Sequence, residues 1–445
     1  MKSKIVLLLA LAGILNLPVM LGAESVPNGS GGTEKGDAQG FRSGQKTVKP
    51  ESVGISTIRL QKVDEMINRH IAAKDVAGAI VVVARRGQVA YFQTFGQMDI
   101  ESRKPMARDA IFRLASMTKP IIGVAIMMLV EEGKVHVDDP VSWFIPQFKS
   151  LNVAVPNLSA PAFVPTAGQP APGAISYTTV PAIREITIRD LLTHTSGLVS
   201  GPISDQEASK APRQSSETLA DYIPRLASFP LEFQPGSRWA YSPRAGFETL
   251  GRIVEVASGQ PLDRFLNQRI FEPLGMKDTY FGPPEARADR IVSIYAKTDK
   301  GLEKQPNDDP RFLPGNVYLA GGGGLSSTAD DYLRFALMLA NGGELDGKRL
   351  LGTRTVEWMR SLHTAPNLPD HIRGEGFGWG VRVIDGSGAG GTMLSEGSFG
   401  WSGTFGTHFW IDPTRQLVAI MLMQAVPNNE MRLEIEAAVM QSIID

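Results

Sequence analysis

The segments of this chain that favour β-strands lie toward its two ends, and helical patterns fill the long stretch between them. Residues 79–84 and 88–96 are rich in β-branched and aromatic side chains and flank a short turn that contains Gly87, which predicts a hairpin. Similar runs return only at residues 376–424, whereas residues 140–290 carry mostly the helical period of apolar side chains. We therefore expect one domain whose sheet is discontinuous in sequence, with a helical region inserted into it.

The composition narrows the chemistry that such a domain can carry. The chain has 445 residues and no cysteine, which excludes disulfides, thiolate metal sites and a cysteine nucleophile. Its 45 basic and 46 acidic residues are evenly mixed, and the net charge is −1. The sequence therefore has no excess of positive charge that would indicate binding to nucleic acid or to an anionic membrane surface. The six histidines are scattered without a metal-binding spacing, so we predict neither a metal site nor a cofactor.

The N-terminus has the pattern of a secretory signal peptide. Lys2 and Lys4 precede an apolar stretch, Ile5–Leu21, and small residues follow it up to Ala23. A membrane anchor is the alternative, but a proline interrupts the stretch, which is also short for a membrane span. We predict a signal peptide at residues 1–23 and an exported protein, either periplasmic or secreted.

The rest of the chain divides by composition. Residues 24–50 are rich in glycine, serine and charge, which predicts a flexible linker. The predicted domain spans residues 51–445, with a sheet lobe at about 51–140 and 290–445 and a helical lobe at about 141–289. Leu151–Pro181 is rich in proline, alanine and glycine and is typical of a long surface loop. No later segment approaches the ~20 apolar residues that span a bilayer, so we expect no membrane span in the mature chain.

Ser116 and Lys119 stand three residues apart at the start of a long apolar segment, Ile111–Lys134, that predicts a helix. Positions i and i+3 share one face of a helix, so the hydroxyl and the amine become neighbours. A serine becomes a good nucleophile when a base accepts its proton, and an uncharged, buried lysine is such a base. The same spacing recurs at Ser43 and Lys46, where the predicted linker offers nothing that would bury the lysine. We therefore predict Ser116 as the nucleophile.

Two further groups would complete the reaction. Tyr241 is the candidate for relaying the proton, because a cation beside a phenol favours the phenolate, which acts as a base. The alternative is a buried aromatic side chain with a bonded hydroxyl. The segment Trp401–Thr404 contains small residues, and an edge strand of this kind can direct a backbone N–H into a cleft. The N–H of Ser116, at the N-terminus of its helix, would be the second donor to the oxyanion. An ordinary core strand is the alternative for this segment.

Other candidate sites fit less well. No Gly-x-Ser-x-Gly occurs, so a nucleophile elbow of the α/β-hydrolase type has no support. Residues 320–328, AGGGGLSST, lack the Gly-Lys-Ser/Thr of a phosphate loop, which favours a structural turn and a helix N-cap. His194, in the sequence LLTHTSGL, is either a base for a serine or a hydrogen-bonding turn residue. His408 alternates within a predicted strand and is either structural or at the rim of a cleft.

These pieces occur in the order found in penicillin-recognising serine hydrolases. The chain resembles the class C β-lactamases, D-Ala-D-Ala carboxypeptidases and family VIII carboxylesterases in Ser116-Met-Thr-Lys119, LLTHTSGL, Tyr241-Ser242-Pro243, GGGGLSST and Trp401-Ser402-Gly403. The resemblance extends over about residues 51–445. It implies an α+β fold, an α/β sandwich in which an antiparallel sheet is flanked by helices and carries an inserted all-α lobe. It also implies catalytic roles for Ser116, Lys119 and Tyr241, and an oxyanion hole made by the backbone N–H groups of Ser116 and Thr404.

Two departures from the family's motifs bear on the substrate. The family's Tyr-x-Asn is Tyr241-Ser242-Pro243 here, and proline has no side-chain amide to steer the amide of a substrate. The family's Lys-Thr-Gly or His-Thr-Gly is Trp401-Ser402-Gly403, three residues that we predict to bind substrate. A lysine at the first position pairs with the carboxylate of penicillins and peptide C-termini. A tryptophan offers an apolar wall instead, which suits uncharged acyl esters.

The sequence therefore predicts an exported serine hydrolase that cleaves short-chain carboxylic esters, or transfers their acyl group, through an acyl-enzyme on Ser116. Its partner is a small-molecule ester, and neither nucleic acid nor a cofactor is expected. β-Lactamase or D-amino-acid peptidase activity is the alternative among enzymes. A non-catalytic binder of β-lactams or peptidoglycan fragments is the alternative of another class, and the complete set of Ser116, Lys119 and Tyr241 argues against it. The oligomeric state is left open.

Overall fold

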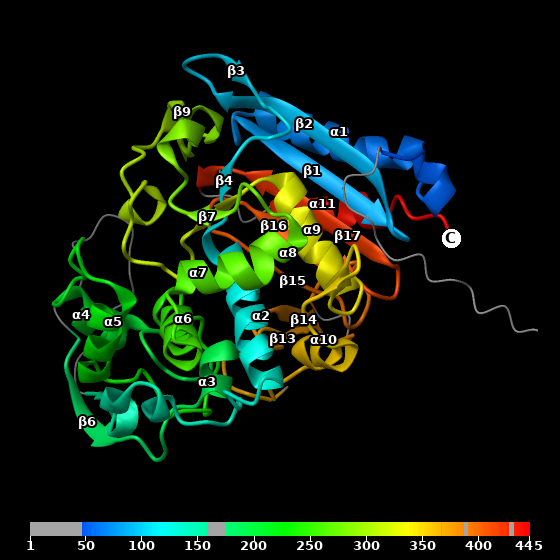
Figure 1. Ribbon diagram of the computed structural model, residues 1–445. Coiled ribbons are helices and arrows are strands. Elements are labelled where there is room, and N and C mark those ends of the chain that lie inside the picture. The colour runs from blue at the N-terminus through cyan, green and yellow to red at the C-terminus, as the bar shows by residue number, and fades with distance from the viewer. Residues whose placement is uncertain (1–46, 158–174, 366, 387–389, 427–430) are drawn as a thin grey trace, which may run out of the picture. The chain divides into compact units, whose positions relative to one another are not determined.

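The computed structural model describes residues 47–157, 175–365, 367–386, 390–426 and 431–445 (Figure 1). All of them belong to one unit of the chain, Gln39–Asp445. The predicted signal peptide (residues 1–23), the second Ser-x-x-Lys (Ser43–Lys46) and most of the predicted linker lie outside the described residues. The end of that linker is described. There the Val48 N–H donates to the Val89 carbonyl at 2.9 Å, and a 3-10 turn follows at Pro50–Val53.

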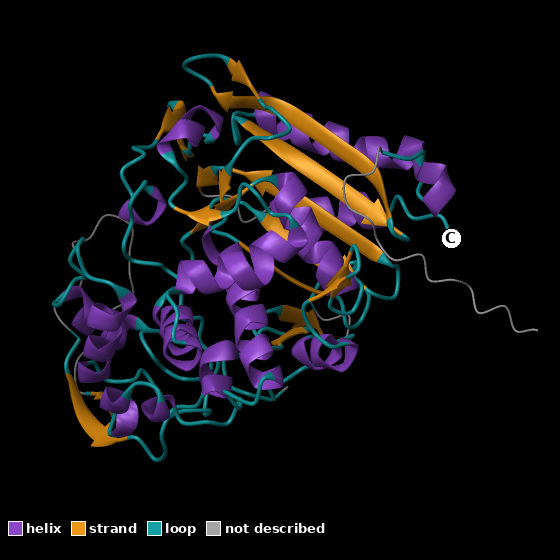
Figure 2. Ribbon diagram, in the orientation of Figure 1, coloured by secondary structure: helices purple, strands orange, loops and turns teal. Residues whose placement is uncertain are grey.

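The central sheet joins the two ends of the sequence. Its eight strands lie in the order β13-β14-β15-β16-β17-β1-β2-β3, and every neighbouring pair is antiparallel. Figure 2 draws the strands in orange and the helices in purple. The strands are β1 (Gly78–Arg85), β2 (Gln88–Asp99), β3 (Lys104–Pro105), β13 (Glu375–Phe377), β14 (Arg382–Ile384), β15 (Phe399–Ser402), β16 (His408–Asp412) and β17 (Leu417–Met423). Val82 of β1 pairs with Ile420 of β17. The prediction of a sheet that is discontinuous in sequence is confirmed.

Helices cover both faces of this sheet. On β1, Ile80 and Val82 belong to the apolar core on the side of α2 and α9, whereas Val81 and Val83 belong to the core on the side of α1 and α11. This alternation is the two-residue period of a strand, and both sets are buried because both faces are covered. The four helices are α1 (Thr57–Ala72), α2 (Thr118–Glu131), α9 (Ala329–Ala340) and α11 (Met431–Met440). The fold is α+β, an antiparallel sheet flanked by helices, as predicted.

Helices and helical turns dominate the region between the two parts of the sheet (Figure 1). The α-helices there are α3 (Ile188–Leu192), α4 (Pro202–Ser209), α5 (Leu219–Tyr222), α6 (Ala245–Ser258), α7 (Leu262–Leu266) and α8 (Glu272–Leu274). The turns are the 3-10 segments Val141–Trp143, Pro146–Lys149, Ile223–Ser228 and Glu285–Arg290, with a π-helical turn at Asn267–Phe271. α6 packs against both α2 and α3, and its Phe247 ring centroid is 5.6 Å from the Lys119 Nζ, which places this part of the helical region against the start of the apolar helix.

The prediction of a long surface loop in this region is wrong at the two ends of the segment. The segment Leu151–Pro181 begins and ends in strands, β5 (Asn152–Pro156) and β6 (Tyr177–Pro181), that pair with each other antiparallel. Val153 and Ala154 are buried, and the Ala154 N–H donates to the Leu231 carbonyl at 2.8 Å, so these residues are anchored to the protein rather than exposed on a loop. Residues 158–174, between the strands, lie outside the described residues.

A small second sheet leads to the predicted nucleophile. It contains β4 (Phe112–Arg113), β10 (Leu325–Ser327) and β7 (Tyr280–Phe281), with β10 in the middle. The glycine-rich segment runs into β10, and the Thr328 side chain then accepts the Asp331 N–H at 3.2 Å at the start of α9. The prediction of a turn and an N-cap is confirmed. The remaining short elements are β8 (Tyr295–Thr298), β9 (Gly301–Lys304), β11 (Glu344–Leu345), β12 (Lys348–Arg349), β18 (Ala425–Val426), α10 (Thr353–Met359) and a 3-10 turn at Pro310–Phe312.

α2 is the central helix of the protein. It is buried continuously from Thr118 to Leu129, which fits a helix that is apolar all round. Neighbouring backbone comes very close to it, since a Cβ on Gly123 would lie 2.7 Å from the Trp379 carbonyl oxygen. Throughout the described ranges no helix, α2 included, combines the length and the apolar character needed to cross a membrane.

Candidate active site

The turn that carries Ser116 connects β4 to α2 in a strained conformation. Ala115 has a φ of 47°, in the left-handed region, which costs a non-glycine residue on the order of 1–3 kcal/mol. The Thr407 hydroxyl holds the turn in place by donating to the Leu114 carbonyl at 2.9 Å. Of residues 111–129, Ser116 is the one that is not buried. The strained turn therefore leaves one side chain of this segment, that of Ser116, partly exposed.

Lys119 lies in the first turn of α2 and is 1 % exposed. Its Nζ is 3.1 Å from the Ser116 Oγ, as the spacing of three residues predicts. The amine also donates to two backbone carbonyl oxygens, that of Pro243 at 2.7 Å and that of Gly322 at 2.6 Å. Two loops distant in sequence thus fix the amine and direct it toward the serine.

Tyr241 approaches Ser116 from the helical region. Its hydroxyl donates to the Ser116 Oγ at 2.7 Å, and its ring centroid is 5.0 Å from the Lys119 Nζ. The next residue anchors the segment, because the buried Ser242 hydroxyl donates to the Leu198 carbonyl at 2.8 Å. Ser116, Lys119 and Tyr241 therefore form one hydrogen-bonded group, which we call the catalytic group. Their individual roles in a reaction stay a prediction.

His194 supports the Tyr241 segment from the protein interior. Its Nδ1 accepts the Ser242 N–H at 3.2 Å, and its carbonyl accepts the Ala240 N–H at 3.1 Å. Burial, together with the charge of Lys119, lowers the pKa of His194 well below its usual range, so the ring is uncharged and its proton is on Nε2. These contacts favour the interpretation of His194 as a turn residue over that of a base for a serine.

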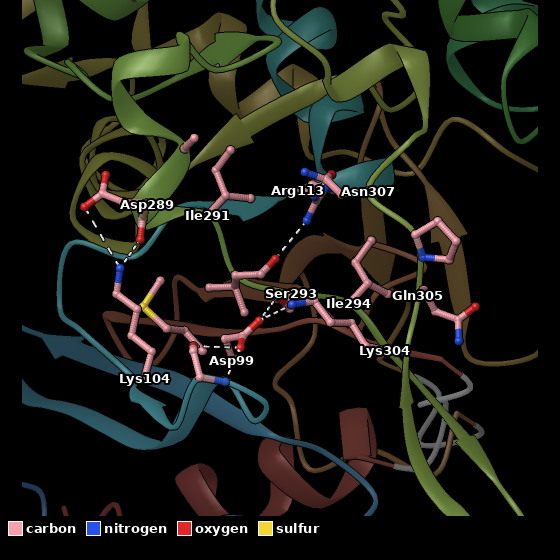
Figure 3. Close-up of a pocket in the computed structure, with 15 residues that line it drawn as sticks. Asp99, Lys104, Arg113, Asp289, Ile291, Ser293, Ile294, Lys304, Gln305 and Asn307 are labelled. Atoms are coloured by element: carbon pink, nitrogen blue, oxygen red, sulfur yellow. Dashed lines mark hydrogen bonds and ion pairs between the residues drawn. The ribbon is translucent and has the colours of Figure 1, made fainter.

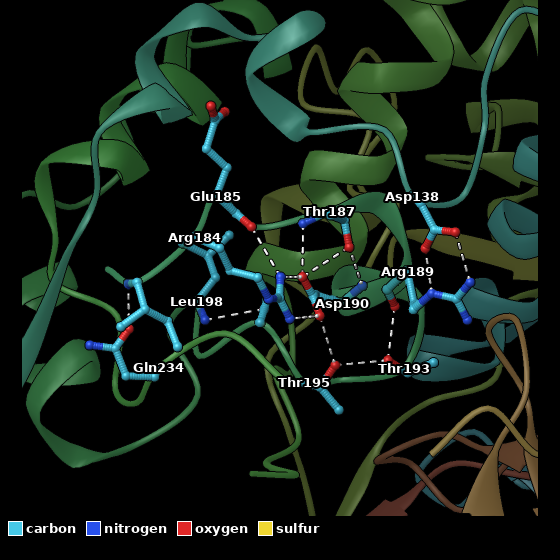
Figure 4. Close-up of polar contacts among 12 residues, drawn as sticks. Asp138, Arg184, Glu185, Thr187, Arg189, Asp190, Thr193, Thr195, Leu198 and Gln234 are labelled. Atoms are coloured by element: carbon cyan, nitrogen blue, oxygen red, sulfur yellow. Dashed lines mark hydrogen bonds and ion pairs between the residues drawn. The ribbon is translucent and has the colours of Figure 1, made fainter. Parts of the chain in front are cut away.

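A polar network fixes the turn on which His194 stands (Figure 4). At the start of α3, Thr187 and Asp190 form a capping box: the Thr187 hydroxyl accepts the Asp190 N–H at 3.3 Å, and the Asp190 carboxylate accepts the Thr187 N–H at 2.8 Å. Arg184 donates twice to the same carboxylate, at 2.6 and 2.9 Å. The Thr195 hydroxyl donates to it at 3.3 Å. The residues around LLTHTSGL therefore hold the Tyr241 segment indirectly.

β15 leads to the predicted oxyanion side of the site. Gly403 follows β15 and lies so close to the Ser116 turn that a Cβ would be 2.2 Å from the Leu114 carbonyl oxygen, an approach that requires glycine. The Gly403 N–H donates to the Thr407 carbonyl at 2.7 Å, and Thr404 is the next residue. The segments that contain the two predicted donors, the N–H groups of Ser116 and Thr404, are thus neighbours. Their binding of an oxyanion stays a prediction.

Trp401 forms an aromatic wall beside Tyr241. The two ring centroids are 5.5 Å apart, and Trp401 also contacts Phe377 at 5.0 Å and stacks on His194 at 6.4 Å. Trp239 extends the wall, with its ring 5.4 Å from Phe377. The indole N–H groups of Trp239 and Trp401 are buried and have no hydrogen-bond partner among the described residues. The wall next to the catalytic group is therefore uncharged and largely apolar.

Ser402 lies on the other face of β15, because successive side chains of a strand alternate. Its Oγ is 2.8 Å from the His408 Nδ1, and the His408 Nε2 is 3.1 Å from Glu436. Arg382 donates to the same carboxylate at 2.8 Å. His408 is therefore a buried residue that links β15 to α11. Of the three predicted substrate-binding residues, Trp401 is the one whose side chain contacts the catalytic group, and substrate contacts of all three stay a prediction.

The carbonyl groups of Pro243 and Gly322 were not predicted from the sequence. No residue type marks a backbone acceptor in a sequence, but the glycine run at residues 321–324 does indicate that backbone approaches closely there. A Cβ on Gly322 would lie 2.9 Å from the Arg244 Cα, so this loop reaches Lys119 only without a side chain. In the described part of the chain, no group of three or more histidine, aspartate or glutamate side chains is arranged to hold a metal ion.

A Ser-x-x-Lys pair at the start of a central helix, with its lysine buried, a tyrosine hydrogen-bonded to its serine and an antiparallel sheet flanked by helices, defines the class of serine hydrolases with the β-lactamase fold. The chain belongs to the Beta-lactamase family, whose model matches residues 63–442. The resemblance predicted from the motifs is confirmed, and the protein is a serine hydrolase.

Several relatives are similar over most of their length. Esterase EstB of Burkholderia gladioli is 30% identical over 81% of this chain and 89% of its own. N-acetylmuramyl-L-alanine amidase of Bacillus subtilis (strain 168) is 28% identical over 85% of this chain and 83% of its own. Among solved structures, EstCE1, a hydrolase with promiscuous acyltransferase activity, has a TM-score of 0.71 and 27% identity, covering 86% of this chain and 99% of that one.

Proposed function

We propose that this protein is an exported carboxylesterase that cleaves short-chain esters, or transfers their acyl groups, through an acyl-enzyme on Ser116. The observation that carries the proposal is the hydrogen-bonded group of Ser116, Lys119 and Tyr241 beside the wall formed by Trp401. The catalytic group supplies a nucleophile and two proton-transfer groups. The wall presents an aromatic face, where the family's lysine would present a cation to a substrate carboxylate.

The arrangement of Lys119 suits a base. An uncharged amine has two N–H bonds, and the two carbonyl groups of Pro243 and Gly322 accept two N–H bonds. In the uncharged form that the mechanism requires, the lone pair would be directed at the Ser116 Oγ, which lies 3.1 Å from the Nζ. Tyr241 reaches the same oxygen at 2.7 Å, so the serine proton has two possible acceptors.

The reaction then follows the usual two steps of acyl transfer. The Ser116 Oγ attacks the ester carbonyl carbon, its proton passes to Lys119 or Tyr241, and the N–H groups of Ser116 and Thr404 hold the oxyanion. The same two side chains return a proton to the leaving alcohol. Water then attacks the acyl-enzyme and releases the acid, whereas an acceptor alcohol in place of water gives acyl transfer.

Two comparisons support an uncharged ester as the substrate. EstB is named an esterase, and EstCE1 is described as a hydrolase with acyltransferase activity. In this chain Tyr241-Ser242-Pro243 also lacks the asparagine side chain of the family's Tyr-x-Asn, and the Pro243 carbonyl is occupied by Lys119. Neither Pro243 nor Trp401 thus offers a group specific for an amide or a carboxylate.

We expect the native chain to hydrolyse p-nitrophenyl butyrate and the Ser116→Ala variant to do so at least about 10³-fold more slowly, because the acyl-enzyme needs the hydroxyl. Initial rates measure the loss, and intact-mass detection should show a butyryl group on the native chain alone. Ser43→Ala is the matched control, since it removes the serine of the other Ser-x-x-Lys, and it should retain full activity. An equally active Ser116→Ala variant would refute the proposal.

The same assay separates the alternatives. Nitrocefin hydrolysis that is faster than ester hydrolysis would show a β-lactamase instead. A persistent mass increase on Ser116 without turnover would show a binder or sensor. Acyl transfer is recognised by a butyrate ester of an added alcohol among the products.

Export rests on the N-terminal pattern of Lys2, Lys4 and the apolar stretch that follows. When the full chain is expressed in a bacterium, we expect the protein in the periplasm or the medium, with the first 23 residues removed. Mass spectrometry of the N-terminal peptide measures the cleavage. Recovery of the uncleaved chain from the cytoplasm would contradict this part of the proposal.

A further inference from the structure

Three arginine side chains of the described residues are almost fully buried, and their charges are balanced differently. Arg85 and Arg382 each pair with a carboxylate, Arg85 with Asp445 at 2.5 Å and Arg382 with Glu375 at 3.0 Å. Arg113 is buried to the same extent, 3 % exposed, yet no carboxylate of the described chain lies within 4.0 Å of its guanidinium. A buried charge without a counter-ion is costly, so Arg113 is the exception that needs an explanation.

The contacts of Arg113 are to neutral groups. Its Nη1 donates to the Val292 carbonyl at 2.8 Å, and its Nη2 donates to the side-chain oxygen of Asn307. Asp309 attracts it only from a distance, and that carboxylate already accepts from the Arg311 Nε at 3.0 Å. Burial lowers the pKa of Arg113 to about 10, with Asp309 opposing the shift. The guanidinium therefore lacks a counter-charge and still has N–H bonds to offer.

Arg113 lines a cavity of about 430 Å³ (Figure 3). Four other charged side chains line the cavity, and they form two opposite pairs: Lys304 binds Asp99, and Lys104 lies 4.0 Å from the Asp289 carboxylate. The charges within each pair cancel, so the charge of Arg113 is the one positive charge left on the wall of the cavity. Apolar side chains, including Met98, Ile291, Ile294 and Pro306, line other parts of the cavity.

We propose that this cavity binds a small carboxylate with a short apolar chain, paired with Arg113. A guanidinium binds a carboxylate through parallel N–H bonds, which would supply the missing counter-charge. The apolar side chains would contact the chain of the ligand, and the volume is in the range of small-molecule sites. The inference rests on the wall of the cavity and does not depend on the proposed ester substrate.

The site is separate from the catalytic group but connected to it by the chain. Arg113 is the last residue of β4, three residues before Ser116. The side chain of Gln424 fixes its backbone, accepting the Arg113 N–H at 3.2 Å and donating to the Arg113 carbonyl at 3.1 Å. A ligand on the guanidinium therefore contacts a side chain whose backbone is already rigid, which favours tight pairing over rearrangement.

Butyrate is the probe that tests this site, titrated by calorimetry into the Ser116→Ala variant of the full chain so that turnover does not interfere. We expect saturable binding, weakened about tenfold or more by Arg113→Gln, because a charged hydrogen-bond pair is lost. Asn307→Asp places a carboxylate of the protein on the same guanidinium. It should also abolish butyrate binding and should raise the melting temperature. Asn152→Asp adds the same charge at an exposed position, the first residue of β5, and should change neither.

Chain length and charge identify the ligand class. Affinity should rise about three- to fourfold for each added CH₂ from acetate to hexanoate, and 1-butanol should not bind. Unchanged butyrate binding in Asn307→Asp overturns the proposal, and so does the absence of saturable binding in the millimolar range. Equal binding of chloride or inorganic phosphate, without chain-length dependence, would show a simple anion site instead. If Arg113→Gln fails to fold, Asn307→Asp still decides the question.

Discussion

The Lys119→Ala variant is expected to hydrolyse p-nitrophenyl butyrate at least about 10³-fold more slowly than the native chain. Lys119 is buried, its Nζ is 3.1 Å from the Ser116 Oγ, and two carbonyl groups hold it in that position. Without the amine the serine loses one proton acceptor, and Tyr241 loses the neighbouring amine, whose Nζ is 5.0 Å from its ring centroid, so both proton-transfer groups are affected. The loss should therefore approach that of Ser116→Ala. Initial rates, with intact-mass detection of the acyl-enzyme, measure it.

Two controls separate chemistry from folding in this experiment. Lys119→Met keeps the apolar stem of the side chain but leaves the carbonyl groups of Pro243 and Gly322 without their donor, which costs about 1–3 kcal/mol for each group left buried. Its unfolding midpoint therefore shows how much of the loss is structural. Lys134→Met removes an exposed lysine just beyond α2 and should retain native activity. Turnover within a few-fold of native in Lys119→Ala would exclude Lys119 as a base.

The side-chain members of the catalytic group were predictable because their chemistry determines their residue types. Ser116 and Lys119 are local in sequence, and the helical spacing alone places them together. Tyr241 is distant, and its residue type and the motif order suggested it. The carbonyl groups of Pro243 and Gly322 could not be inferred from residue type, since every residue has a carbonyl group and its direction depends on the folded loops.

Strand pairing limited the remaining predictions. The sequence of β5 and β6 predicts a loop because it is rich in proline and alanine and because residues 158–174 separate the two paired strands. The hydroxyl of Ser402 lies against His408, a contact that its place next to Trp401 in the sequence does not indicate, and the predicted binding of substrate by Ser402 stays a prediction. The link from His408 to Glu436 joins a strand to the C-terminal helix, a contact that no local pattern records.

The largest stability effect is expected from Glu436→Ala, which should lower the free energy of unfolding by about 3–5 kcal/mol. Glu436 is 1 % exposed and accepts from Arg382 at 2.8 Å, from Thr392 at 2.6 Å and from the His408 Nε2 at 3.1 Å. Removing its carboxylate leaves a buried guanidinium with Glu375 as its remaining counter-ion. Urea unfolding at pH 7 measures the change. Glu434→Ala on the same helix removes a more exposed carboxylate that pairs with Arg69, and it should cost less than about 1 kcal/mol.

The contribution of Glu436 to stability should depend on pH, and the shift in its pKa gives the direction of the change. Burial alone would raise the pKa of Glu436, but the hydrogen bond and charge of His408, with the charge of Arg382, outweigh it and lower the pKa from 4.5 to about 2. A lowered pKa in the folded state contributes stability above about pH 4.5, and this stability is lost as the pH falls toward 2. The shift corresponds to about 3 kcal/mol. The difference in unfolding free energy between the native chain and Glu436→Gln should therefore shrink between pH 5 and pH 2, whereas a difference independent of pH would show that Glu436 acts through packing alone.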